Sequence, residues 1–428
     1  MSAQLTLQAP QVVPPAEVSP FLERLWQDGL QGSTGASTFT LLVWEPAWLE
    51  QQLVRIGELD GPITGLISET MLETARPFTT RCELPPSLAP LDPRLSWAMR
   101  LLPGAHQVQD LRGRVVEGTI SSQMPRRLIT LAPTLDTQRP LETLVAAYCP
   151  LPEEGGAGAA CGDVIVLRGG MGSLREGLAL IPPLVADDLP CWVWWNSSLD
   201  EPPEMLEALA CLPRRLVIDT SLGRPRRCLD LLVERIALGQ AVNDLNWLRL
   251  RGWRESLAMV FDPPSRRDAL AHVVQLDIDV EGDHPVKGLL LAAWIADRLG
   301  WHRVHSRPGE EGGVVAEFER NDGATVRFRL MPVPVGVPKA HPGAIVGLRL
   351  ICEPPGRSHL CVILCSESGG CMRLESGGMA AMELAEEVVP LPEESEEREM
   401  ARLLGGGHDS TNPLLAAAAP LAAELLPA

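Results

Sequence analysis

Between about residue 100 and residue 240, short apolar runs alternate with stretches whose apolar residues recur at helical spacing. The apolar runs have the length of buried strands, and the helical stretches can connect one strand to the next. This alternation predicts βαβ units, which form a parallel sheet with helices on both faces. The predicted strands are Arg127–Leu131, Leu144–Cys149, Asp163–Leu167, Cys191–Trp195 and Leu216–Asp219, and the predicted helices are Leu174–Leu184, Pro203–Cys211 and Arg227–Leu238. We therefore expect a parallel, doubly wound (flavodoxin-like) α/β domain over residues 100–240.

A different pattern follows over residues 241–392. Val274–Val280 alternates apolar and polar residues with period two, and Val286–Leu299 has the pattern of a helix that stops at Gly300. Further apolar runs predict strands at Val314–Arg320, Thr325–Leu330, Ala344–Ile351 and Leu360–Cys365. One helix beside several strands predicts an α+β domain with a mostly antiparallel sheet.

The two ends of the chain have weaker patterns. Residues 1–99 predict an N-terminal α/β unit, with a loose arm over residues 1–35 and a strand at Thr38–Val43. Residues 393–428 predict an acidic tail with a helix after Asn412 and Pro413. The sequence leaves open whether this tail docks or is mobile.

The stretch Asn243–Asp262 combines a polar helix start, Asn243 and Asp244, with an unusual density of tryptophan and arginine. An apolar stripe at helical spacing follows, and two prolines end the helix; the stripe is Trp253, Leu257, Val260 and Phe261, and the prolines are Pro263 and Pro264. One interpretation is a helical hairpin whose tryptophans fill the core. The other is a recognition surface, since Trp and Arg carry much of the binding energy at interfaces. Its candidate partner-binding residues are Trp247, Arg249, Arg251, Trp253 and Arg254, of which Trp253 fits the core best.

Charge and composition limit the classes of partner. The net charge of −18 argues against nonspecific nucleic-acid binding, which needs cations to replace counterions. Residues 214–254 are an exception, because nine arginines there outnumber four acidic residues; a solvated helix face and a site for an acidic partner or a phosphate are the alternatives. Without a signal peptide or an apolar run of about 18 residues, the chain is expected to be cytoplasmic and not membrane-bound. Its ten cysteines then predict reduced thiols rather than a disulfide framework.

Candidate catalytic and cofactor sites are few. Gly169–Gly172 follows a predicted strand, as phosphate-binding loops do, but lacks the G-x-G-x-x-G spacing and a P-loop lysine. A plain turn and a nucleotide or sugar-phosphate crevice are the alternatives there. The eight histidines show no H-E-x-x-H or G-x-S-x-G context, and an extended strand spreads His359, Cys361 and Cys365 too far for one zinc ion. We expect no catalytic residues, no metal and no cofactor.

Cys365 and Cys371 flank the loop Ser366–Gly370, which contains a glycine pair. In a hairpin with this loop the two cysteines can face each other across antiparallel strands. Directly opposed Cα atoms lie roughly 4.5–5.5 Å apart, which is within the range of a disulfide. The spacing therefore permits a reversible disulfide.

Five parts of the chain carry a family resemblance: VNDLNWLRLRGWRESLAMVFD, PVKGLLLAAWIADRLGW (Pro285–Trp301), ASTFTLLVWEP (Ala36–Pro46), PCWVWWN (Pro190–Asn196) and the region of Cys149 and Cys161. Together they resemble the OpcA family, the assembly and activating proteins of glucose-6-phosphate dehydrogenase. The resemblance implies a non-enzymatic protein that binds this dehydrogenase, favours its active oligomer and supports the oxidative pentose phosphate pathway. It also implies that thioredoxin is a partner, that Cys365 and Cys371 are the redox-active pair, and that the oxidised form is the stronger activator. The alternative function is an enzyme or sensor that binds a nucleotide or sugar phosphate in the crevice after strand 163–167.

Overall fold

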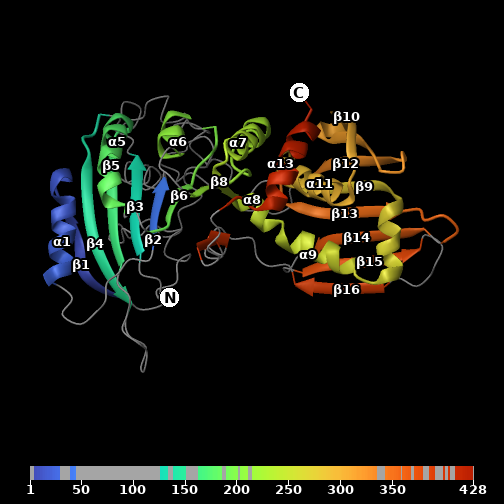
Figure 1. The fold of residues 1–428 in the computed structure, drawn as a ribbon, viewed down its shortest axis with the longest axis horizontal. Coiled ribbons are helices and arrows are strands. Elements are labelled where there is room, and N and C mark those ends of the chain that lie inside the picture. Colours follow the sequence, from blue (N-terminus) through green and yellow to red (C-terminus); the bar gives the residue numbers. More distant parts are fainter. Residues whose placement is uncertain are drawn as a thin grey trace, which may run out of the picture. The chain divides into compact units, whose positions relative to one another are not determined.

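The computed structural model describes residues 4–28, 39–44, 126–133, 138–150, 162–185, 189–200, 203–210, 215–334, 343–357, 359–367, 371–378, 385–390, 399–400, 403–404 and 410–427. The chain divides into two compact units. Unit 1 comprises Met1–Ile218 with Glu396–His408, and unit 2 comprises Asp219–Ser395 with Asp409–Ala428. Figure 1 shows their strands and helices.

Unit 1 is built on a parallel sheet with the strand order of a Rossmann fold. Its parallel strands are β2 (Phe39–Trp44), β3 (Arg126–Pro133), β5 (Gly162–Gly169), β6 (Cys191–Trp195) and β7 (Arg215–Ile218). They are arranged β5-β3-β2-β6-β7, which is the order 3-2-1-4-5 of Rossmann folds, whereas flavodoxin-like sheets have the order 2-1-3-4-5. The predicted doubly wound parallel domain is confirmed. Its flavodoxin-like order was wrong, because local patterns do not encode which edge of the sheet each crossover reaches.

The N-terminal residues that the structure describes complete this sheet instead of forming a unit of their own. β2 pairs with β3 on one side and β6 on the other, so it lies inside the sheet. β1 (Gln4–Val12) pairs antiparallel with β4 (Glu142–Pro150), which pairs antiparallel with β5. α1 (Val18–Asp28) follows β1. Residues 4–28, expected as part of a loose arm, thus form an edge strand and a helix. Most of the rest of the predicted N-terminal unit, including residues 45–99, lies outside the described residues.

The connections after β5 and β6 are helical. α5 (Met171–Gly177) follows β5, and α6 (Pro203–Ala210) follows β6. α5 is shorter than the predicted helix Leu174–Leu184, which continues as the 3-10 turns η5 (Leu178–Leu180) and η6 (Pro182–Leu184). The prolines at 182 and 183 lack the N–H groups that an α-helix needs.

Unit 2 begins at Asp219 and contains the stretch rich in tryptophan and arginine. α7 (Pro225–Ala237) leads to β8 (Ala241–Asp244), which is followed by α8 (Leu245–Arg249) and α9 (Arg251–Val260). α9 ends just before Pro263, as predicted, and α10 (Pro264–Arg267) and η7 (Asp268–His272) follow. The stretch is thus two short helices with a bend at Leu250.

The sheet of unit 2 has the strand order β10-β11-β12-β9-β13-β14-β15-β16. Neighbouring strands pair antiparallel, except for the parallel pair β9 and β12. This confirms the predicted α+β domain, although β10 and β16 were not predicted and β15 was implied only by the hairpin at Cys371. The strands are β9 (Val273–Glu281), β10 (His302–Pro308), β11 (Val314–Glu319), β12 (Thr325–Val333), β13 (Ile345–Cys352), β14 (Leu360–Glu367), β15 (Cys371–Gly378) and β16 (Ala385–Pro390).

α11 (Val286–Leu299) packs on one face of this sheet, and its bounds match the predicted helix. Gly300 ends the helix at φ 67°, a left-handed conformation that suits glycine. Helix and sheet approach closely at Gly288, where a Cβ atom would lie 2.6 Å from Leu330 Cδ1 and 3.0 Å from Val280 Cγ1. A side chain at this position would therefore require the Leu330 and Val280 side chains to shift.

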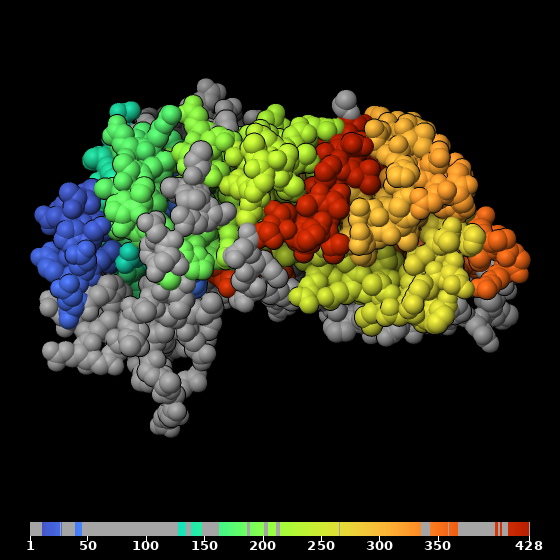
Figure 2. All heavy atoms as spheres, viewed as in Figure 1, coloured from blue at the N-terminus to red at the C-terminus, as the bar shows by residue number. Residues whose placement is uncertain are grey.

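The C-terminal helix α13 (Pro413–Leu425) docks within unit 2, against α7, α11 and β10. Asn412 caps its start by accepting a hydrogen bond from Leu414 N at 2.9 Å, and Arg226 of α7 donates to Ala423 O at its end at 3.1 Å. Figure 2 shows the red atoms of this helix lying against the orange strands. Over residues 410–427 the tail therefore docks. The sequence had left open whether it docks or is mobile.

Candidate functional site

The bend between β8 and α8 is organised by Asp244. Its carboxylate accepts hydrogen bonds from Asn246 N (3.2 Å) and Trp247 N (3.3 Å), which makes it the N-cap of α8. It also accepts bonds from Thr220 N (2.9 Å) and Thr220 Oγ1 (2.8 Å), so it ties the helix start to the segment after β7. The predicted polar start of this stretch is confirmed.

Arg249 lies in a buried ion pair. Its guanidinium donates to Asp219 Oδ1 at 3.0 Å and to Oδ2 at 2.6 Å, and the two side chains are 0% and 3% exposed. Ser221 N and Oγ also donate to Asp219 Oδ1, at 2.9 and 2.6 Å. The expectation that Arg249 lies on a partner-binding surface is therefore corrected. This network was not predicted, although the polar run Asp219–Ser221 directly after an apolar strand was a signal for it.

The two tryptophans of the stretch belong to the core of unit 2. Trp247 and Trp253 are each 1% exposed, and the rest of the predicted apolar stripe is buried as well. The guanidinium of Arg254 lies over the Trp247 ring, 3.8 Å from its centroid, and burial lowers the pKa of Arg254 to about 10. Arg251 is exposed and pairs with Glu255 at 2.7 Å. Of the five candidate partner-binding residues, only Arg251 and Arg254 reach the surface, so partner binding stays a prediction for these two.

In the arginine-rich segment 214–254, several of the arginines that the structure describes make contacts within the protein. Arg215 lies over the Trp192 ring at 4.7 Å, Arg226 binds carbonyls at the end of α13, and Arg235 and Arg249 are buried. These four arginines therefore serve internal contacts.

Asp244 should make the stability of the protein depend on pH. Burial and the nearby Asp219 carboxylate raise the pKa of Asp244 from 3.8 to about 6. The folded state therefore binds this proton more tightly than the unfolded state, and the group favours folding increasingly as the pH falls through 6. As the pH falls from 7.5 to 5, we expect protonation of Asp244 to raise the free energy of unfolding by roughly 1 kcal/mol. Denaturant unfolding of wild type and Asp244→Asn measures this: the rise should be smaller in the variant, and equal pH dependence would contradict the assignment.

Two stacked tryptophans end the strands beside which Rossmann folds bind dinucleotides. The dinucleotide crevice of Rossmann folds lies at the carboxyl ends of the strands where the strand order reverses, here between β2 and β6. Trp44 and Trp195, the last residues of these strands, stack with ring centroids 5.2 Å apart and an interplanar angle of 7°. They are 0% and 1% exposed. After Trp44 the sequence reads Glu45-Pro46-Ala47, without the glycines that let a backbone approach a pyrophosphate.

The second candidate crevice, at Gly169–Gly172, is covered by the segment 139–141. Gly170 N and Ser173 Oγ both donate to Arg139 O, at 3.0 and 2.9 Å. A Cβ atom at Gly169 would lie 3.3 Å from Leu141 Cα, so the glycine accommodates this close backbone contact. The N-terminus of α5 thus has protein partners where a phosphate would bind, and the interpretation as a plain turn fits the geometry.

The hairpin of β14 and β15 has a different register from the predicted one. Cys365 lies opposite Arg373, and Cys371 lies opposite Glu367. The predicted direct opposition of Cys365 and Cys371 is wrong, because the strands continue through Ser366 and Glu367 and leave only residues 368–370, outside the described residues, for the turn. The cysteines are diagonal neighbours, whose Cα atoms are typically about 7–8 Å apart. A disulfide between them requires the backbone to move.

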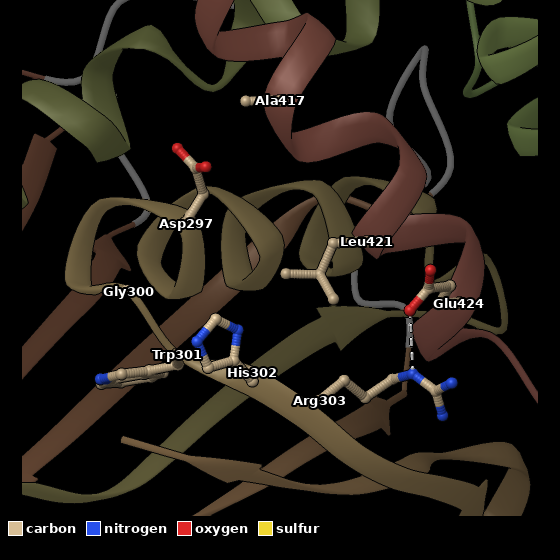
Figure 3. A pocket seen from close by; sticks show the side chains of 8 residues that line it. All are labelled: Asp297, Gly300, Trp301, His302, Arg303, Ala417, Leu421 and Glu424. Carbon is tan, nitrogen blue, oxygen red and sulfur yellow. Dashed lines mark hydrogen bonds and ion pairs between the residues drawn. The ribbon is translucent and has the colours of Figure 1, made fainter. Parts of the chain in front are cut away.

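A pocket of about 410 Å³ lies between α13 and the end of α11 (Figure 3). Arg303 Nε donates to Glu424 Oε2 across it at 3.1 Å. Its lining residues are Asp297, Gly300, Trp301, His302, Arg303, Ala417, Leu421 and Glu424. Its ionisable groups are carboxylates, an imidazole and a guanidinium, without a Ser, Cys or Lys nucleophile.

Within the part of the chain that the structure describes, no three His, Cys, Asp or Glu side chains are grouped so that they could hold a metal ion. In the same residues, no helix is long and apolar enough to span a membrane.

Two protein-family models match the chain, and both describe a subunit of glucose-6-phosphate dehydrogenase. The model of its N-terminal domain matches residues 117–234, and the model of its C-terminal domain matches residues 240–419. Curated proteins named OpcA, of the OxPP cycle, are similar over most of their length. The protein from Synechococcus elongatus is 34% identical, over 93% of this chain and 92% of its own length. The protein from Nostoc punctiforme is 29% identical, over 92% of this chain and 90% of its own length.

Solved structures also show a distant similarity. The open conformation of KijD10, a 3-ketoreductase from Actinomadura kijaniata, has a TM-score of 0.38 at 12% identity, over 61% of this chain and 80% of that chain. A super-repressor mutant of Gal80p from Saccharomyces cerevisiae has a TM-score of 0.37 at 9% identity, over 60% of this chain and 80% of that chain.

Proposed function

The chain belongs to the OpcA family, and from this membership we propose that it is a non-enzymatic protein that binds glucose-6-phosphate dehydrogenase, promotes its active oligomer and activates it. It acts in the cytoplasm and supports the oxidative pentose phosphate pathway. The observation that carries the proposal is the match of both parts of the chain to domains of a glucose-6-phosphate dehydrogenase subunit. The 34% identity to a protein named OpcA over 93% of the chain supports it.

The strand ends of unit 1 support a role in binding rather than catalysis. Rossmann-type enzymes bind their dinucleotide outside the carboxyl ends of these strands, over a glycine-rich turn. In this protein β2 and β6 end in the stacked and buried Trp44 and Trp195, and Glu45-Pro46-Ala47 follows Trp44 in place of the glycines.

We propose further that activation depends on the redox state of Cys365 and Cys371, with thioredoxin as the reducing partner. In the reduced protein the register holds the two cysteines at diagonal positions of one hairpin. Reduction transfers two electrons and two protons from the thioredoxin dithiol to the disulfide, which gives two protein thiols and oxidised thioredoxin. Because the disulfide requires a backbone shift, oxidation changes the hairpin as well as the thiols.

Cys365→Ser should abolish the effect of thioredoxin on dehydrogenase activation, because the remaining thiol cannot form the bond. Cys361→Ser is the matched control, since Cys361 lies on the same strand and is also half-buried. Activation is measured after treatment with oxidant and with reduced thioredoxin, alongside thiol labelling and peptide mapping. A Cys365→Ser protein that responds like wild type, or a loss of response in Cys361→Ser alone, contradicts the assignment of the pair.

Co-elution of the purified chain with glucose-6-phosphate dehydrogenase on a sizing column tests the proposed function. We expect them to co-elute, and we expect the chain alone to show no stabilisation by nucleotides or sugar phosphates. A ligand at 100 times its dissociation constant would stabilise the protein by about 2.7 kcal/mol, which a thermal melt detects. Separate elution together with stabilisation by one of these ligands would instead support an enzyme or sensor.

A further inference from the structure

One face of the sheet in unit 2 carries α11, and the opposite face, which we call the open face, presents polar side chains. Along β12 the buried residues Phe328 and Leu330 alternate with the exposed residues Arg327, Arg329 and Met331. The same alternation continues on β9 and β13, the next strands in the sheet (Figure 1). Side chains of alternating residues point to opposite faces of a strand, so these residues share one surface.

Asp277 of β9 holds two arginines in place on the open face. Arg329 Nε donates to Asp277 Oδ1 and Arg349 Nε to Oδ2, each at 2.9 Å, from the strands on either side. Gln275 Nε2 adds a bond to Oδ2 at 2.7 Å. The Asp277 side chain is 8% exposed, whereas each arginine is 44% exposed. The carboxylate therefore lies beneath a layer of guanidinium groups.

The guanidinium groups retain capacity to bind a partner. Arg329 binds Asp277 through Nε, and its terminal nitrogens make no hydrogen bond to any residue that the structure describes. Arg327, two residues earlier on the same strand, is exposed and makes no ion pair within the described part of the chain. Because Arg329 and Arg349 are already ordered by Asp277, binding through them costs less side-chain entropy than binding through mobile arginines.

Apolar groups surround these arginines. Met331 is 43% exposed beside Arg329, and the half-buried Ile363 lies opposite Arg349 on β14. Arginine and methionine are enriched at protein interfaces relative to other surfaces. The open face therefore has residue types typical of a docking surface, with a cluster of three guanidinium groups above the Asp277 carboxylate. The same face also carries the carboxylates of Asp279, Glu281, Glu317 and Glu319, so its positive charge is confined to the cluster of Arg327, Arg329 and Arg349.

We propose that the open face, centred on Arg327, Arg329 and Arg349, docks on an acidic surface of glucose-6-phosphate dehydrogenase. This inference rests on the proposed function and names the surface that performs it. Charge complementarity selects the occupant, because exposed guanidiniums pair with carboxylates of a partner.

The same surface includes the candidate redox cysteine. Cys365 lies opposite Gly347 on β13, and Arg349 is two residues further along that strand on the same face. Gly347 has no side chain, and Asp279 Oδ2 lies 3.3 Å from the position its Cβ would take. A change in the hairpin at Cys365 therefore alters the open face directly, which gives redox state a physical route to partner binding.

Arg327→Glu tests the proposal without disturbing the Asp277 cluster. We expect it to weaken binding to the dehydrogenase by about tenfold or more, as loss of a well-placed interface arginine does, and Arg327→Lys to weaken it less. Arg357→Glu is the control, since Arg357 is also exposed but lies in the loop between β13 and β14. Dissociation constants are measured with immobilised dehydrogenase at low and high salt, and circular dichroism melts confirm that each variant is folded.

The outcomes separate this inference from the proposed function. Weakened binding by Arg327→Glu with unchanged binding by Arg357→Glu supports the open face, and the affinity of wild type should fall with salt. Wild-type affinity in Arg327→Glu overturns the open face while leaving the proposed function intact. If wild type itself does not bind, the proposed function fails and the inference fails with it. If Arg327→Glu loses only self-association, the occupant is a second copy and the inference is wrong.

Discussion

Replacing Arg249 with alanine is expected to lower the free energy of unfolding by about 3–5 kcal/mol. The substitution leaves Asp219 ionised in the interior without its cation, and a buried carboxylate that loses its partner is costly. Because Asp219 also organises Ser221, the segment after β7 should loosen as well. Chemical denaturation of the two proteins measures the difference.

Arg251→Ala is the matched control for Arg249. It lies two residues away and also forms an ion pair, but its side chain is 58% exposed. Exposed pairs contribute at most about 1 kcal/mol, so this variant should unfold almost like wild type. A loss of stability in Arg249→Ala no larger than that in Arg251→Ala would show that the ion pair with Asp219 is not formed in solution.

Trp253→Ala should destabilise the protein by a similar amount, about 3–5 kcal/mol, because it leaves a cavity in the core of unit 2. Trp253 is 1% exposed, whereas Met259 on the same helix is 55% exposed. Met259→Ala should therefore change the free energy of unfolding by less than about 0.5 kcal/mol. Thermal melts of the pair provide the comparison, and equal melting temperatures would place Trp253 at the surface instead.

The helices and strands with strong local signals could be predicted from the sequence. Val286–Leu299 and Gly300 show helical periodicity followed by a glycine stop, and the structure places the helix over the same residues. Asp244 caps a helix because its short carboxylate reaches the free N–H groups of the first turn. Such signals lie within a few neighbouring residues, so no tertiary information is needed to find them.

Interactions between distant residues could not be predicted in this way. Arg249 looked like a surface cation because Asp219 lies 30 residues earlier in the chain. The strand order of unit 1 depends on where each crossover returns, and the cysteine register depends on where the hairpin turn begins. The open face was missed because its arginines come from separate strands that only the folded sheet brings together.

The binding function is tested most directly by titrating glucose-6-phosphate dehydrogenase with the oxidised chain and with the thioredoxin-reduced chain, while measuring initial rates and the mass of the complex. We expect saturable activation, a complex that contains both proteins, and stronger activation by the oxidised form. An unchanged rate at saturating chain, with the two proteins sedimenting separately in both redox states, would contradict the account.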